Sequence, residues 1–417
     1  MLINKNIFPG QGFADPHAIV ENGRVYIFSG HDKTPRTENT WIMDKWQIIS
    51  SADLINWRKD GEILPTQTYI GESDTCWAGY IQKKDNKFYW YFSNKFYDTG
   101  VVVSDQIEGP YVDILQKPLI PAGFSDTKSY DPCVFEENGV HTIFFGAGHY
   151  YCATLGDDMM SLASDAARIH VYDEDGNECQ TSDKSTVFKV NDTYYLAYGS
   201  KYAISDKLKG PYKFMGKFIG GGHNDVFKFN DKLYLCNEFH DTSIFYRGIR
   251  VMELNFNSDG TVVIDKDDEE DVHFNKTWDF TNYNMHWFLT NGENSIHENS
   301  AIVYNLSTDL ALRSPLWPGV AIQANKDYTL TMEIEQSDNH VFFMATIMTA
   351  SGIGAYWNTL EKDCEIYNVE LINICDNVYQ AKIPKIEKTP VILRYLSICA
   401  KNDKIKGFVK IKNISFK

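Results

Sequence analysis

The sequence lacks the cysteine patterns that hold metal ions or cross-link small secreted domains. Its eight cysteines, at positions 76, 133, 152, 179, 236, 364, 375 and 399, form no Cys-x-x-Cys pair and show no zinc-type spacing. Several fall inside apolar strand patterns such as residues 233–236 (LYLC). Because a free cysteine is one of the most often buried residue types, this pattern predicts buried thiols rather than disulfides.

A long apolar run is also missing. No segment reaches the roughly 18 residues that a membrane-spanning helix needs. Residues 1–8 (MLINKNIF) do not contain the apolar centre of a secretory signal. As the sequence stands, we expect a cytoplasmic protein, or a secreted one if a signal was removed, and no membrane as a partner.

Positive charge is scarce. The chain has 40 Lys and Arg against 56 Asp and Glu, a net charge of -16 at pH 7. Such a chain repels nucleic acids, phosphorylated polymers and anionic membrane surfaces, so a neutral ligand fits better. The aromatic content of 14% suits stacking on sugar rings as well as a β-rich core. These features favour a neutral ligand as the partner and leave the oligomeric state open.

Helical periodicity is nearly absent, and a repeated β pattern takes its place. A polar or glycine turn followed by an aromatic-rich strand occurs five times, at a spacing of roughly 40–60 residues that suits one propeller blade with its loops. The five segments are 21–28 (ENGRVYIF), 84–92 (KDNKFYWYF), 137–145 (ENGVHTIFF), 190–198 (VNDTYYLAY) and 229–237 (FNDKLYLCN). The sequence therefore predicts an all-β protein in which residues 1–264 form a five-bladed β-propeller.

A second domain is expected because the repeat stops near residue 240 and 417 residues exceed the usual size of one hydrophobic core. Residues 265–271 (DKDDEED) are interpreted as an acidic, solvated linker. Alternating segments such as 328–335 (YTLTMEIE) predict a β-sandwich of the jelly-roll type over residues 272–417. This domain is expected to be carbohydrate-binding-like or structural. Four tryptophans suit either a sugar platform or a core: Trp278, Trp287, Trp317 and Trp357.

Three aspartates each immediately precede a predicted strand, where a side chain can point from the inner end of a blade into the central pocket. They are Asp15, Asp131 and Asp183. Asp followed by Pro commonly opens a turn, so each residue alone also has a structural interpretation. Two of the three are followed by proline at equivalent places in different blades, which indicates carboxylates converging on the propeller axis.

Many short motifs follow one another in a specific order. The first predicted blade contains 13–16 (FADP), 25–32 (VYIFSGHD) and 50–57 (SSADLINW). Further along lie 76–79 (CWAG), 87–91 (KFYWY), 103–105 (VSD), 109–110 (GP), 117–120 (KPLI), 155–159 (LGDDM), 210–212 (GPY), 222–224 (GHN), 246–247 (YR) and 259–260 (DG). In this order the motifs resemble glycoside hydrolase family 43, and the resemblance covers about residues 10–264.

The resemblance implies a propeller that hydrolyses arabinofuranosyl or xylosyl linkages with inversion, using three carboxylic residues. By motif, Asp15 would be the general base that activates water, and Asp131 would orient the acid and tune its pKa. Asp183 would stand where the family has a glutamate as the general acid. An inverting enzyme needs base and acid on the two sides of the scissile bond with room for a water. A neighbouring carboxylate can raise the pKa of the acid.

Asp183 departs from the family pattern because aspartate is one methylene shorter than glutamate. A shortfall of about 1 Å in a proton-transfer distance can lower a rate on the order of a hundredfold. Lys184 would favour the ionised form of this carboxylate if its side chain pointed inward. Glu178 is a second candidate for the acid, and a solvated loop residue is its alternative role.

Four further residues are candidates for substrate binding. His223 matches a family histidine near the axis, beside a bound calcium ion or water, and we do not expect it to be a direct metal ligand; a structural histidine is the alternative. Trp77 and Phe13 suit either stacking on a sugar or core packing. Arg247 suits either substrate hydroxyls or an ion pair. No cofactor is required, and a structural Ca²⁺ near the axis is compatible with the resemblance.

The leading prediction is an inverting glycoside hydrolase of the α-L-arabinofuranosidase or β-xylosidase type. A catalytically weakened carbohydrate-binding protein is the second hypothesis, because of Asp183 and the additional domain. A third is a cytoplasmic enzyme of glycan assembly or remodelling that reuses the propeller, since a fold hosts several activities. The sequence leaves the sugar, the linkage and the exo or endo mode open.

Overall fold

The computed structural model describes most of the chain. The described residues are 2–33, 37–219, 222–263, 276–281, 284–290, 301–304, 310–337, 342–351, 361–387, 391–401 and 408–417. The predicted acidic linker at 265–271 and Trp357 lie outside them. Within these ranges the chain forms β-strands and two short 3₁₀ turns, η1 (Pro65–Gln67) and η4 (Glu361–Asp363). No helix in this part of the chain is long and apolar enough to cross a membrane.

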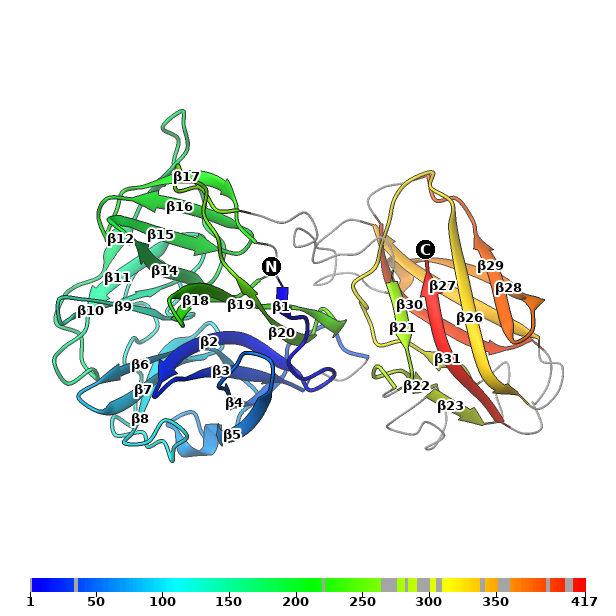
Figure 1. Cartoon of the computed structure of the whole chain (residues 1–417), viewed down its shortest axis with the longest axis horizontal. Helices are drawn as coiled ribbons and strands as arrows, with labels where there is room; N and C mark the ends of the chain where they lie inside the picture. Colours follow the sequence, from blue (N-terminus) through cyan, green and yellow to red (C-terminus); the bar gives the residue numbers. More distant parts are fainter. Residues whose placement is uncertain are drawn as a thin grey trace. The chain divides into compact units, whose positions relative to one another are not determined.

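The chain divides into two compact units, and the described residues of the first form five small, mainly antiparallel sheets. Their strands run through the colour series from blue to green in Figure 1. The first three sheets hold β2 (Phe13–Glu21), β3 (Arg24–Asp32), β4 (Met43–Ser51) and β5 (Trp57–Ile63); β6 (Cys76–Lys84), β7 (Lys87–Asn94) and β8 (Asp98–Ser104); and β9 (Cys133–Glu137), β10 (Val140–Phe145), β11 (Tyr150–Thr154) and β12 (Ala167–Ile169).

The last two sheets are completed by segments from elsewhere in the chain. The fourth holds β14 (Ser185–Val190), β15 (Thr193–Tyr198), β16 (Lys201–Ser205) and β17 (Tyr212–Lys217), with β13 (Val171–Tyr172) parallel to β17. The fifth holds β18 (Asn224–Phe229), β19 (Lys232–Ser243) and β20 (Tyr246–Glu253), and β1 (Leu2–Asn4) pairs with β20. The first and last parts of this unit therefore share one sheet.

The predicted repeats are the second strands of the five sheets. Each begins after a tight turn with left-handed residues, as at Asn22, Asn138 and Asn191, where φ is 48°, 54° and 53°. Asparagine and glycine favour these turns because they tolerate positive φ. Aromatic side chains of these strands pack between neighbouring sheets; Phe28 of β3 and Trp90 of β7 stack 5.3 Å apart.

The first strands of the five sheets close a ring. β2 contacts β6, β6 contacts β9, β9 contacts β14, β14 contacts β18, and β18 contacts β2 again. Five sheets whose inner strands form a closed cycle are the blades of a five-bladed propeller, which confirms the fold prediction. The inner strands place their side chains around one axis.

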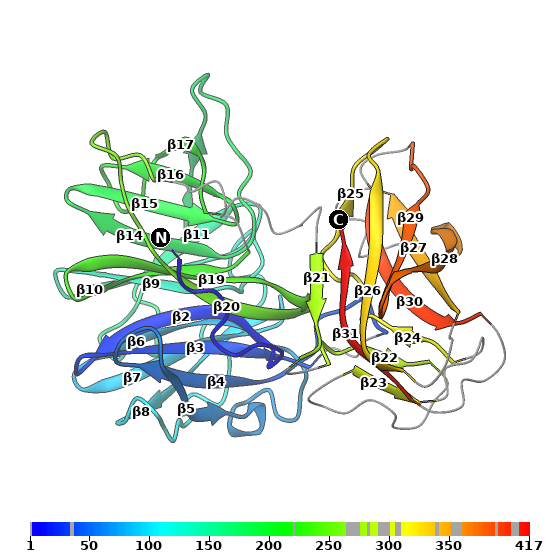
Figure 2. The same cartoon turned by 45° about the vertical axis from the view of Figure 1, so that its right-hand side comes forward.

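The second unit is a curled β-structure of eleven strands, shown in yellow to red in Figures 1 and 2. Two layers face each other across one core, and β28 pairs with β27 of one layer and β29 of the other. The strands are β21 (Lys276–Asp279), β22 (Phe288–Leu289), β23 (Ala301–Tyr304), β24 (Leu312–Arg313), β25 (Ala321–Ile322), β26 (Tyr328–Ser337), β27 (Phe343–Ser351), β28 (Glu365–Cys375), β29 (Val378–Ile383), β30 (Val391–Ala400) and β31 (Phe408–Phe416).

Three of the four tryptophans singled out in the sequence are core residues of this unit. Trp278, Trp287 and Trp317 are each 0% exposed, so their rings offer no surface for a sugar. The unit also includes residues 240–246 of the β19–β20 hairpin, and Ile244 and Phe245 pack with Trp317. The second unit therefore includes a short segment that lies inside the range 1–264 predicted for the propeller, in addition to the range 272–417 predicted for the second domain.

Four of the eight cysteines are buried thiols, as the sequence predicts, and the other four are not. None of the eight, all of which the structure describes, forms a disulfide. Cys76, Cys133, Cys152 and Cys236 are buried in strands of the propeller, whereas Cys375 is exposed. Burial raises the pKa of the Cys133 thiol to about 12, so this side chain behaves as a small neutral core residue.

Candidate active site

The predicted carboxylates lie where inner strands begin, at the centre of the ring. Asp15 and Asp131 have left-handed backbones, with φ of 52° and 55°. Each is followed by a proline, whose ring fixes its own φ near -65°. In the fourth blade no proline follows Asp183, and the left-handed residue is Lys184, with φ of 45°.

Asp15 is held by a buried arginine. Arg247 donates from its Nη1 atom to Asp15 Oδ1 at 2.8 Å, and the Asp15 side chain is 3% exposed. Burial raises the pKa of Asp15 to about 7, although the charges of Arg247 and His223 act in the opposite direction. The predicted base therefore changes its charge near neutral pH. Arg247 forms an ion pair, which is one of the two roles that the sequence allows.

Two carboxylates that sequence reasoning missed complete the surroundings of Arg247. Asp32 accepts hydrogen bonds from Arg247 Nε and Nη2 at 2.9 Å each. Glu238 Oε2 accepts from Arg247 Nη1 at 2.9 Å and from the Asp15 backbone N–H at 3.0 Å. For Glu238, burial is outweighed by the charges of Arg247 and His223, which lower its pKa to about 2. Gly222 leaves room for this residue, since a Cβ there would lie 2.1 Å from Glu238 Oε1.

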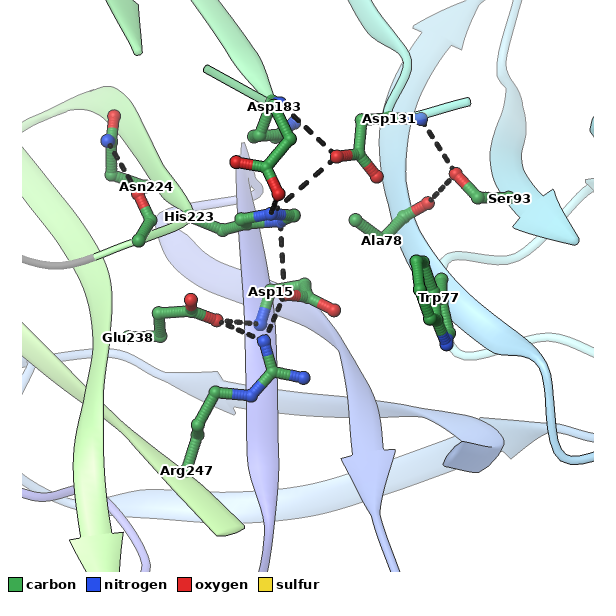
Figure 3. A network of polar contacts seen from close by, with 12 residues as sticks. Asp15, Trp77, Ala78, Ser93, Asp131, Asp183, His223, Asn224, Glu238 and Arg247 are labelled. Carbon is green, nitrogen blue, oxygen red and sulfur yellow. Dashed lines mark hydrogen bonds and ion pairs between the residues drawn. The ribbon is translucent and has the colours of Figure 1, made fainter. Parts of the chain in front are cut away.

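His223 lies between the predicted catalytic residues, as Figure 3 shows. Its Nδ1 is 3.0 Å from Asp15 Oδ1, while its Nε2 is 3.6 Å from Asp131 Oδ2 and 3.8 Å from Asp183 Oδ2. Burial opposes its charge, but the surrounding carboxylates, Asp15 and Asp131 first, raise the pKa of His223 to about 10. The imidazolium therefore joins all three aspartates in one electrostatic unit.

Hydrogen bonds hold both the backbone and the side chain of Asp131. Its N–H donates to Ser93 Oγ at 2.9 Å, and Ser93 in turn donates to the Ala78 carbonyl at 2.6 Å. Its Oδ2 accepts the Lys184 backbone N–H at 3.2 Å, whereas the buried Oδ1 has no hydrogen-bond partner. Burial raises the pKa of Asp131 to about 7, with a further rise from Asp183. A carboxylate with one unpaired buried oxygen is suited to carry a proton near neutral pH.

Asp183 differs from the other two in its exposure. Its side chain is 53% exposed, against 3% for Asp15 and 1% for Asp131. The hydroxyl of buried Tyr150 donates to its carbonyl oxygen at 2.9 Å, which fixes the backbone below the carboxylate. The pKa of Asp183 is lowered: desolvation acts to raise it, but the hydrogen bond and the charge of His223 outweigh that effect.

Glu178, the second candidate for the acid, has other partners. Its Oε1 atom lies 2.9 Å from Arg168 Nη2 and 2.8 Å from His170 Nδ1. The hydrogen bond from His170 lowers the pKa of this exposed carboxylate. These contacts keep Glu178 in a surface ion pair, away from the contacts that join Asp15, Asp131 and Asp183.

The two aromatic candidates occupy different environments. Phe13 is 1% exposed, lies in a hydrophobic cluster and stacks on Phe8 at 5.2 Å, so core packing is the role that its surroundings favour. Trp77 is half-buried and pairs with Ser93 across β6 and β7. The centre of its ring lies 6.4 Å from that of Tyr130, which precedes Asp131 directly. Trp77 therefore packs beside the residue before a candidate carboxylate, and it is not part of the fully buried core.

One group of the described residues has the spacing of a metal site. Asp131, Asp183 and His223 each offer an atom within 4.8 Å of the others. Calcium prefers six to eight oxygen ligands, but this group offers two carboxylates and one nitrogen. The residues therefore do not fit calcium as direct ligands, and a protonated His223 already neutralises part of their charge.

Comparison with known proteins agrees with the geometry. The family model described as Glycosyl hydrolases family 43 matches residues 5–262. The chain is 26% identical over 324 residues to a xylosidase/arabinosidase of Bacteroides ovatus, covering 62% of this chain and 96% of that protein. A GH43 beta-xylosidase/alpha-arabinofuranosidase from a compost microbial metagenome, solved with xylotriose in a calcium-free form, matches with a TM-score of 0.55 and 25% identity over 63% of this chain and 97% of that one.

A further solved structure extends the similarity to the second unit. It is a glycoside hydrolase family 43 arabinoxylan arabinofuranohydrolase from Bacillus subtilis in complex with cellotetraose. It covers 96% of this chain and 99% of its own, with a TM-score of 0.52 and 19% identity. At this identity the match shows the fold alone.

Proposed function

The chain belongs to glycosyl hydrolase family 43 and is a glycoside hydrolase, and we propose that it cleaves arabinofuranosyl or xylosyl linkages of oligosaccharides with inversion. The names of the similar proteins support these two sugars. The observation that carries the proposal is the cluster of Asp15, Asp131 and Asp183 around His223 at the propeller axis.

Asp15 is the proposed general base. Above its pKa of about 7 the carboxylate is ionised and accepts a proton from the attacking water. Arg247 donates a hydrogen bond to Asp15 Oδ1, and in this proposal the second carboxylate oxygen, Oδ2, accepts the proton of the water. The His223 ring lies between Asp15 on one side and Asp183 on the other. An inverting enzyme needs base and acid on the two sides of the scissile bond with room for a water, and the proposal assigns these two places to Asp15 and Asp183.

Asp183 is the proposed general acid, and Asp131 is the neighbouring carboxylate that tunes its pKa. In the free site the pKa of Asp131 is raised and the pKa of Asp183 is lowered. A bound sugar covers the exposed Asp183 carboxylate, and this desolvation, together with the charge of Asp131, raises the pKa of Asp183. The protonated Asp183 then faces the leaving oxygen. Trp77 is the proposed platform for the sugar ring.

The proposal is tested with para-nitrophenyl α-L-arabinofuranoside and β-D-xyloside, and with the corresponding oligosaccharides. We expect turnover of at least one pentoside, and proton NMR of the first product should show the inverted anomer. A retained anomer contradicts inversion. Binding of oligosaccharides without turnover would instead support a carbohydrate-binding role for the propeller. The Lys189→Met variant is a suitable control, because Lys189 lies on the surface paired with Glu137.

A calcium ion near His223, with water as its main ligand, is the finer part of the proposal. The thermal midpoint and the turnover are measured after EDTA treatment and again after adding Ca²⁺. A midpoint that falls with EDTA and returns with Ca²⁺ supports the ion. Equal values in all three conditions exclude it, and the proposed steps, which use only side chains, remain.

A further inference from the structure

A second polar layer lies on the same axis as the carboxylates, and every blade contributes to it. Two residues beyond Asp15, Asp131 and His223 come His17, Cys133 and Asp225, because alternate residues of a strand share a face. Tyr80 of β6 contributes the second blade, with its ring 4.4 Å from that of His17. The fourth blade contributes Lys184, which is 2% exposed.

Lys184 is the charged centre of this layer. Its ammonium contacts His17 Nε2 and donates to the Pro132 carbonyl at 3.2 Å, and its charge lies 5.6 Å from the centre of the Tyr80 ring. The Lys184 backbone is left-handed, with φ of 45°, and its side chain is buried beside His17 and Tyr80.

The polar contacts of the layer are consistent with one set of protonation states. Burial, together with the charge of Lys184, lowers the pKa of His17 to about 4, so its imidazole is neutral. Nε2 then accepts from Lys184, and Nδ1, which lies 3.3 Å from Asp225 Oδ2, carries the hydrogen. Asp225 is fixed in turn by the Ala18 backbone N–H at 2.9 Å. An ammonium buried without such partners would be strongly destabilising.

The backbone of Lys184 connects this layer to the catalytic one. Its N–H donates to Asp131 Oδ2, and the peptide just before it holds the Asp183 carbonyl that accepts from Tyr150. The position of the Asp183 carboxylate therefore depends on the turn at residues 183–184. Tyr150 holds the Asp183 carbonyl in this turn, and the buried side chain of Lys184 holds the residue that follows.

We propose that Lys184 is a positioning residue for Asp183: its ammonium, anchored on His17 and Pro132, fixes the left-handed turn that places the short carboxylate beside His223. The inference rests on the proposed function, because it assumes that Asp183 donates a proton. The groups that face the ammonium are His17 of β2, Tyr80 of β6, Cys133 of β9, Asp225 of β18, and the carboxylates Asp15 and Asp131.

The test compares two substrates of the same sugar. One has a dinitrophenyl leaving group, which departs without a proton, and the other is an alkyl glycoside or disaccharide, which needs one. Lys184→Met keeps the length of the side chain and removes its charge. We expect its kcat on the unactivated substrate to fall about tenfold to a hundredfold with KM little changed, because a displacement of about 1 Å is enough for such a loss. On the activated substrate, the kcat of Lys184→Met should remain within about threefold of the kcat of the unsubstituted protein.

Two more variants keep the test decisive. Lys184→Met leaves Asp225 without its cation, so the double variant Lys184→Met/Asp225→Asn restores charge balance if the single variant does not fold. The double variant should fold and retain the selective loss. In Lys184→Met/Asp183→Glu the extra methylene should recover part of the lost rate on the unactivated substrate.

The outcomes separate this inference from the proposed function. If Asp183→Ala shows the selective loss and the Lys184 variants do not, positioning by Lys184 is wrong and the proposed acid stands. If Asp183→Ala itself shows no selectivity, the assignment of the acid fails first. Equal losses on both substrates in the folded Lys184 variants would show a merely structural lysine and overturn the inference.

Discussion

We call the short segment at the start of an inner strand its entrance: residues 15–16 in the first blade, 131–132 in the third and 183–184 in the fourth. The backbone of the first and third entrances bends at a different residue from that of the fourth. In the former, the left-handed residue is an aspartate, and a proline with a restricted φ of its own follows it. In the fourth blade the left-handed residue is Lys184, one position further along, and the turn is fixed by contacts of a buried side chain.

This shift by one residue changes the carboxylate as well. Asp15 and Asp131 are buried and their pKa values are raised to about 7, whereas the Asp183 side chain is 53% exposed and its pKa is lowered. A left-handed conformation outside glycine is unfavourable by roughly 1–2 kcal/mol, so each entrance needs compensating contacts. The comparison indicates that similar aspartates obtain different chemistry from the residue that follows them.

The largest effect is expected at the first entrance. Asp15→Asn should lower kcat/KM by about a hundredfold to ten-thousandfold, because the amide cannot accept the proton of water. The amide oxygen can still accept from Arg247, so the fold should persist. Turnover of both pentosides and the thermal midpoint are measured together. Undiminished turnover in a folded variant would remove Asp15 from the mechanism.

The second effect tests the fourth entrance and should depend on the leaving group. Asp183→Ala should lose about a hundredfold on unactivated glycosides, and far less on dinitrophenyl glycosides, because only the former need a proton. Asp183→Glu should maintain or raise the rate on unactivated glycosides. The ratio of the two kcat/KM values is the measurement. If neither variant loses activity on either substrate, another residue supplies the proton.

The sequence was sufficient for the propeller because each second strand repeats a turn whose chemistry is local. Asn22 and Asn138 mark such turns, and the aromatic residues after them fill the space between blades. The pairing of β1 with β20 and the packing of Ile244 and Phe245 with Trp317 join distant parts of the chain. No local pattern carries that information, so the sequence predicted neither.

The same distinction applies to the site. Asp15, Asp131 and Asp183 each precede a predicted strand, and proline follows the first two. The resemblance in motif order assigns a role to Asp183 and indicates His223. Asp32 and Glu238 gave no such signal, since their role follows from meeting Arg247 across the ring. For Lys184 the sequence leaves the direction of the side chain open, because its contacts with His17 and Tyr80 join distant parts of the chain.

The third prediction concerns pH and the two raised carboxylates. The pKa of Asp15 is about 7 in the free protein, and the base must be ionised to act. We therefore expect kcat/KM to fall about tenfold per pH unit as the pH drops below 7. A profile recorded in Asp131→Asn, which retains Asp15, should keep this limb. If the limb vanishes in that variant, the titration belongs to Asp131.

The smallest effect is expected in stability at the third entrance. The folded pKa of Asp131, about 7, lies above its ordinary value of 3.8, so the folded state favours the protonated form. The ionised carboxylate is thus a destabilising group that is absent below pH 4, grows between pH 4 and 7, and is complete above 7, with an upper bound of about 4 kcal/mol. Asp131→Asn removes it and should raise the thermal midpoint at pH 8 more than at pH 5. Melting curves at the two pH values measure the difference. A lower midpoint for the variant at pH 8 would show that the ion pair with His223 and the hydrogen bond from the Lys184 N–H stabilise the charged carboxylate more than burial destabilises it.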